Sequence, residues 1–185
     1  FADLGATDKI QVAIMLDRWG WHDQAIVWLA EAQYWDDLWL RFPLPFREEF
    51  RAAAREAGIP EVWLYTIART ESLFNPRALS PVGARGIAQV MPATATATAR
   101  RADIPYRGGD ALYDVDINLR LGAAYIAQML ERFGDRWLFA VPAYNAGPGR
   151  IPNWLPSVTM EPDVWIENIP FNETRGYIQR ALYHR

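Results

Sequence analysis

The chain lacks most of the side chains on which nucleophilic and metal-assisted catalysis depend. It has 185 residues, no cysteine, two histidines and, among its 19 basic residues, the single lysine Lys9. Without cysteine there is no thiol nucleophile, disulfide framework or cysteine-rich zinc site, and two histidines near opposite ends of the chain, His22 and His184, exclude a three-histidine metal site. A Ser-His-Asp triad is disfavoured as well. Lys9 lies near the N-terminus in a helical pattern, which also disfavours a Schiff-base lysine. If the protein is a cofactor-free enzyme, its proton chemistry is therefore expected to depend on carboxylates.

The charge and the hydrophobic runs disfavour two further classes of partner. The net charge is −3 and the isoelectric point is near 5.4, so we expect no basic surface for nucleic acid. No run approaches the roughly 18 apolar residues of a membrane span, and an integral membrane protein is not expected. The opening residues FADLGATDKI contain neither an initiator methionine nor an apolar signal segment. This start is typical of a processed or truncated product.

Apolar residues recur with helical spacing along nearly the whole chain, and no convincing strand alternation is present, which predicts an all-α fold. One helix is expected over 8–19, ending at Gly20, and a second over 22–41. Together they form a short helical hairpin, residues 1–42. The proline-rich segment FPLPF that follows does not continue a helix. Residues 43–185 are therefore predicted to form a separate compact unit.

Further helices are expected in this second unit. Their predicted ranges are 46–57, 60–72, 92–101, 117–133, 135–146 and 172 to the end. Asp116, Asp135 and Asn172 are the expected N-caps of the last three, and Pro142 should kink its helix or remove a hydrogen bond. Residues 150–171 contain four prolines and are predicted to be an irregular loop. Most of the nine tryptophans are expected in the core.

One carboxylate lies in an unusual place in this pattern. The apolar stripe of its expected helix runs through Leu64 and Ile67, and the next position on the stripe is Glu71. Partial burial and the negative end of the helix dipole would both favour the protonated form of this acid. The alternative is that Glu71 points outward in the last turn and pairs with Arg69 or Arg77.

Three motifs give the chain a resemblance to a known family. They are RTESLFNPRALSPVGARGIAQVMPATA at 69–95, AYNAGPGRI at 143–151 and IPFNETRGYI at 169–178. In this order they resemble the soluble lytic transglycosylases of glycoside hydrolase family 23. The resemblance implies a lysozyme-like α-helical catalytic domain that acts on peptidoglycan. Residues 1–42 are similar in character to the last helices of the superhelical domain that precedes it in the long soluble members.

The resemblance also implies the site residues. The catalytic acid/base of the family's Glu-Ser motif falls on Glu71. The substrate-binding residues that it implies are Ser80, Gly86, Gln89, Met91, Tyr144, Asn145 and Glu173. Two departures from the family pattern stand out: Ala88 replaces a methionine of the cleft, and Pro142 precedes the Ala-Tyr-Asn motif. For Glu173, a plain helix-start charge is an equal alternative. No metal and no cofactor is implied.

The implied reaction is cleavage of the β-1,4 bond between N-acetylmuramic acid and N-acetylglucosamine, with formation of a 1,6-anhydromuramoyl product. The implied partners are peptidoglycan strands and muropeptides, the implied location is the periplasm, and the expected state is monomeric. Two alternatives remain open. One is a hydrolytic, goose-type lysozyme on the same fold, and the other is a non-catalytic glycan-binding module.

Overall fold

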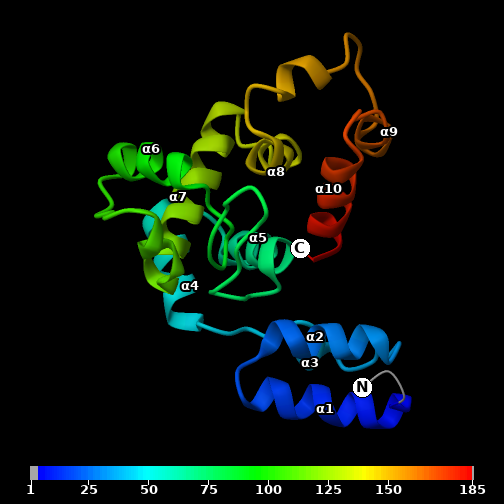
Figure 1. The fold of residues 1–185 in the computed structure, drawn as a ribbon. Helices are drawn as coiled ribbons and strands as arrows, with labels where there is room; N and C mark the ends of the chain where they lie inside the picture. The colour runs from blue at the N-terminus through cyan, green and yellow to red at the C-terminus, as the bar shows by residue number, and fades with distance from the viewer. Residues whose placement is uncertain (1–3, 185) are drawn as a thin grey trace.

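The structure, a computed structural model, describes residues 4–184 and is built of helices joined by short loops (Figure 1). Within that range it has no strand, only the isolated bridges of Arg85 with Leu79 and Val90. The predicted all-α fold is confirmed. The helices are α1 (Ala6–Arg18), α2 (His22–Glu31), α3 (Leu38–Arg41), α4 (Arg47–Ala57), α5 (Glu61–Ser72), α6 (Pro92–Ala102), η1 (Gly109–Tyr113), α7 (Val115–Arg132), α8 (Trp137–Ala146), η2 (Ile151–Trp154), α9 (Pro162–Glu167) and α10 (Asn172–His184).

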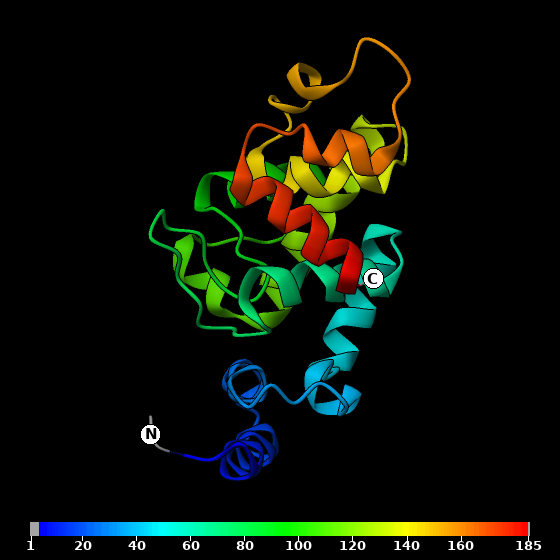
Figure 2. The same cartoon turned by 90° about the vertical axis from the view of Figure 1, so that its right-hand side faces the viewer.

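The first two helices pair as the predicted hairpin, below the rest of the molecule in Figures 1 and 2. The single helix expected over 22–41 is wrong, because α2 ends at Glu31 and the short α3 begins at Leu38. Gln33 takes a left-handed backbone conformation with φ of 52°, which a continuous helix excludes. Asp37 then starts α3, since its side chain accepts a hydrogen bond of 3.0 Å from Leu40 N. The domain boundary at residue 43 stays a prediction.

The expectation that most tryptophans lie in the core is wrong. Within residues 4–184, only Trp137 and Trp165 are buried. Four of the nine are exposed, and all four lie in or beside the helices of the hairpin: Trp19, Trp21, Trp35 and Trp39. The hairpin is one layer of paired helices, so a large side chain that does not face the partner helix remains at the surface.

Helix α7 is the centre of the larger unit and contacts α4, α6, α8 and η1. Its N-cap is Asp114, whose side chain accepts a hydrogen bond of 3.0 Å from Ile117 N. The predicted cap Asp116 is wrong by two residues, because it already lies in the first helical turn. A cap needs extended backbone angles, and Asp114 has them, with φ of −78° and ψ of 127°.

Two further corrections concern the C-terminal third. Asp135 does not cap α8, because its φ of 59° places it outside the helix and Arg136 occupies the cap position. The loop expected over 150–171 contains η2 and α9, each with a proline in its first turn, where the missing N–H costs nothing. Pro142 lies inside α8 without ending it.

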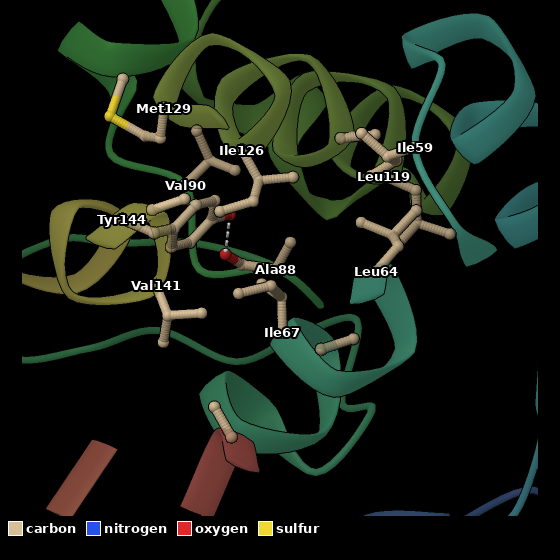
Figure 3. Close-up of a cluster of buried hydrophobic side chains, with 14 of the residues drawn as sticks. Ile59, Leu64, Ile67, Ala88, Val90, Leu119, Ile126, Met129, Val141 and Tyr144 are labelled. Atoms are coloured by element: carbon tan, nitrogen blue, oxygen red, sulfur yellow. Dashed lines mark hydrogen bonds between the residues drawn. The ribbon is translucent and has the colours of Figure 1, made fainter. Parts of the chain in front are cut away.

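Figure 3 shows the part of the core that supports the site. Ile67 of α5, Ile126 of α7 and Tyr144 of α8 surround Ala88 and Val90 of the loop that follows α5. The Tyr144 hydroxyl donates a hydrogen bond of 2.8 Å to the Ala88 carbonyl. These contacts hold the loop against three helices at once.

Candidate active site

Glu71 lies in the last turn of α5, and the chain ends the helix directly after it. Leu73 and Phe74 both take left-handed backbone angles, with φ of 54° and 70°. The buried ring of Phe74 packs edge-on against Phe50 and Tyr65, which compensates for this strained turn. Glu71 is therefore held at a fixed helix end, next to the loop that follows.

The Glu71 carboxyl is set for proton transfer near neutral pH. Burial raises its pKa from 4.5 to about 7, against the lowering effect of a hydrogen bond from Tyr177. The Tyr177 hydroxyl donates this bond to Oε1 at 2.8 Å. The charge of Glu173 raises the pKa further and that of Arg180 lowers it. A carboxyl with this pKa exists in both protonation states at neutral pH, as a general acid/base requires.

The outward Glu71 that was the alternative from the sequence is not seen. Its carboxyl bonds to Tyr177, and no ion pair joins it to Arg69 or Arg77 in residues 4–184.

The loop after α5 is fixed by side chains that sequence reasoning missed. Ser72 Oγ donates to the Ile87 carbonyl at 2.7 Å and so ties the loop to the end of α5. From α7, the fully buried Asn118 accepts a bond from Ala88 N and donates to the carbonyls of Arg85 and Leu112, each at 2.8 Å. The signal in the sequence is an asparagine among the apolar residues of a core helix, which must find partners.

Four of the predicted substrate-binding residues line one cavity of about 230 Å³. They are Gln89, Met91, Tyr144 and Asn145. Asn145 Oδ1 accepts a hydrogen bond of 2.9 Å from Thr174 Oγ1, which links this wall to α10. The hydroxyl that contacts Glu71 belongs to Tyr177 and not to Tyr144, which bonds to the Ala88 carbonyl. Burial and the charge of Glu71 raise the pKa of Tyr144, so that its phenol remains neutral.

The other three predicted residues lie outside this cavity lining. Ser80 Oγ accepts a hydrogen bond of 2.9 Å from Ala84 N in a tight turn. Gly86 is buried, and a Cβ there would lie 2.0 Å from the Leu112 carbonyl oxygen. Glu173 is exposed in the first turn of α10, and its effect on the pKa of Glu71 is electrostatic.

No three acidic or histidine side chains in residues 4–184 are grouped so that they could hold a metal ion. Of the helices that the structure describes, none combines the length and the hydropathy needed to cross a membrane.

Comparison with known proteins matches the chain to one family. Residues 48–163 match the family model described as "Transglycosylase SLT domain". The soluble lytic murein transglycosylase of Salmonella typhimurium is 38% identical over 179 residues, which are 95% of this chain and 28% of that protein.

Solved structures give the same result. An inactive mutant of the lytic transglycosylase Slt from Pseudomonas aeruginosa superposes with a TM-score of 0.94 at 40% identity, over 99% of this chain and 30% of that one. The 70-kDa soluble lytic transglycosylase of Escherichia coli gives a TM-score of 0.93 at 36% identity, over 98% and 30%. The chain thus spans less than a third of the length of these relatives. The family model covers more than half of the chain, and the chain belongs to the transglycosylase SLT domain family.

Proposed function

We propose that this chain is a catalytic unit that cleaves the β-1,4 bond between N-acetylmuramic acid and N-acetylglucosamine in peptidoglycan and forms a 1,6-anhydromuramoyl product. The observation that carries the proposal is Glu71, whose pKa is raised to about 7 and whose carboxyl bonds to a neutral tyrosine hydroxyl. The names of the relatives support the same activity. Assignment to glycoside hydrolase family 23 and action in the periplasm, where peptidoglycan lies, belong to the proposal.

In the first step Glu71 donates its proton to the glycosidic oxygen while the bond from that oxygen to C1 of the muramoyl residue breaks. The N-acetyl group of the same sugar stabilises C1, so a second protein carboxylate is not needed. The Tyr177 hydroxyl stabilises the carboxylate left behind, because its hydrogen bond favours the charged form.

In the second step the Glu71 carboxylate takes the proton of the muramoyl 6-hydroxyl as its oxygen forms a bond to C1. This step closes the 1,6-anhydro ring and returns Glu71 to the protonated state. No water is consumed. An acid that acts first as proton donor and then as base needs a pKa near the working pH. Burial at the end of α5 raises the pKa of Glu71 into this range.

The remaining site residues are proposed to bind sugar. Those that line the 230 Å³ cavity would contact the glycan beside the reacting bond. Ser80 and Glu173 would contact it from the neighbouring loop and from the start of α10. Gly86 would act through the shape of the loop, since its Cα faces Leu112 and Asn118.

The test of the proposed function is the mass of the released muropeptides. Purified cell wall is digested, and the products are separated and weighed by mass spectrometry. Anhydro products, lighter by one water than hydrolysed ones, are expected. Hydrolysed products would instead support the goose-type lysozyme alternative, and no release at all would support a glycan-binding module.

The hydroxyl of Tyr177 is expected to shift the pH dependence of the reaction. Its hydrogen bond lowers the pKa of Glu71, so Tyr177→Phe should raise that pKa. Because the protonated acid starts the reaction, the fall in activity at rising pH should move to higher pH, with a decrease in kcat of roughly ten-fold from the loss of one charge-assisted hydrogen bond. Tyr144→Phe is the matched control, since its hydroxyl bonds to Ala88. Equal pH profiles for Tyr177→Phe and the unmodified chain would contradict this role.

A further inference from the structure

A second cavity, of about 290 Å³, lies on the other side of α5 from Glu71. Its walls are the segment 42–44, the face of α5 that carries Val62 and Arg69, and the end of α10. The end of α10 lies beside α5 in Figure 1. Successive residues of a helix are rotated by about 100°, so Arg69 and Glu71 point to nearly opposite sides of α5. The lining is mainly apolar and includes Phe42, Leu44 and Val62.

Arg69 is the unusual member of this lining, because its buried charge has no acidic partner among residues 4–184. It is only 7% exposed, and its Nε and Nη1 atoms have no hydrogen-bond partner among the described residues. Burial, and then the neighbouring positive charge of Arg41, lower its pKa to about 10, so it stays protonated at neutral pH. Buried arginine is rarely left unpaired, since an unsatisfied buried donor destabilises the fold.

None of the described residues that line the cavity neutralises the charge of Arg69. The one acid among the lining residues, Glu61, lies with its Oε2 3.9 Å from Arg51 Nε. Burial and the charges of Arg69, Arg180 and Arg41 lower the pKa of His184 to about 4, so the imidazole adds no charge at neutral pH. The Phe42 ring lies against the Arg69 guanidinium, with 4.9 Å from Cζ to the ring centroid.

We propose that this cavity binds a monocarboxylate attached to a compact apolar group. The carboxylate would accept charge-assisted hydrogen bonds from the Arg69 guanidinium where it borders the cavity. The apolar group would lie among the side chains of Phe42, Leu44 and Val62. The cavity has one guanidinium in an otherwise mainly apolar lining, which suits a ligand with one negative charge. The volume of the cavity is at the lower end of the range for small-molecule sites, roughly 300 Å³, which suits a compact ligand. The ligand is either a free small acid or the C-terminal residue of a peptide.

The test is a titration of the 185-residue chain with two matched pairs of probes. 4-Methylpentanoate stands for a free acid and N-acetyl-leucine for a peptide terminus, and each is compared with its amide. Binding is measured by calorimetry and by the NMR signal of the Arg69 Nε–H group, which the Arg69→Met spectrum assigns. At least one acid should bind about ten-fold or more tightly than its amide, because bonds to a charged group are the stronger ones. Tighter binding of 4-methylpentanoate would identify a free acid as the ligand, and tighter binding of N-acetyl-leucine would identify the C-terminal residue of a peptide.

Two variants distinguish the contribution of the Arg69 charge to binding from that of the cavity volume. Arg69→Met should remove the preference for acid over amide. Val62→Trp fills the cavity from its rim and should weaken both probes while Arg69 stays, which keeps the proposal testable if Arg69→Met does not fold. Arg55→Met, at an exposed arginine of α4, is the control and should bind normally. Equal affinity of acid and amide, no binding of either acid, or unchanged binding in Val62→Trp would overturn the proposal.

Discussion

Glu71→Gln is expected to lower the turnover of peptidoglycan by about 10²- to 10⁴-fold, the range that general acid/base catalysis supplies. Glutamine has the shape of the acid and can still accept a hydrogen bond from Tyr177, but it neither donates nor takes the proton. The fold should persist. The measurement is the rate of muropeptide release, with Glu48→Gln, at an exposed glutamate of α4, as the control that keeps full activity.

The same variant should change how stability depends on pH. Because the folded protein raises the pKa of Glu71 above its ordinary 4.5, the stability that the protonated carboxyl contributes is complete below pH 4.5 and is lost as pH rises through about 7. Urea unfolding of Glu71→Gln should lack this loss between pH 4.5 and 7. Turnover close to that of Glu48→Gln, or an unchanged pH dependence of stability, would contradict the role given to Glu71.

Gly86→Ala is expected to lower the free energy of unfolding by about 3 kcal/mol or more. The φ of Gly86 is +75°, and a Cβ would lie 2.0 Å from the Leu112 carbonyl oxygen and 2.3 Å from Asn118 Nδ2. Both are contacts that real Cβ atoms do not make, so Asn118 would have to move and release its bonds to the loop and to Leu112. Activity should fall as well, because this loop carries Gln89.

Gly83→Ala is the matched control for this prediction. Gly83 lies in the same loop and has a positive φ of +93°, but a Cβ there meets nothing within 4 Å. It should therefore show only the cost of backbone strain, of order 1–2 kcal/mol. Denaturant unfolding of both variants measures the difference. Equal losses of unfolding free energy in the two variants would mean that the close packing of Gly86 against Asn118 of α7 does not hold the loop.

The sequence was sufficient to place Glu71 at the end of the buried face of α5 but not to identify Tyr177 as its hydrogen-bond partner. Leu64 and Ile67 define the buried face of α5, and a carboxylate one turn further on the same face is visible in the periodicity. Tyr177 lies 106 residues away, and only the tertiary fold brings the two together. One local signal was available, since Tyr177 comes four residues after Glu173 on the same helix face.

Local backbone choices account for the wrong predictions of helix ends and caps. Neither glycine nor proline marks the break between α2 and α3, which depends on the left-handed angle of Gln33. At the start of α7, Asp114 and Asp116 are chemically equivalent caps, and only the backbone angles decide between them. Such choices are set by packing with distant parts of the chain, which hydrophobic periodicity does not contain.

The most direct test of the account is the pKa of Glu71 itself. The carboxyl carbons of ¹³C-labelled glutamate are followed by NMR as pH is raised, and the signal absent from Glu71→Gln identifies the site. The account predicts a midpoint near pH 7, raised by burial at the end of α5. A midpoint near the ordinary value of 4.5 would leave Glu71 ionised at neutral pH and would contradict its role as the proton donor.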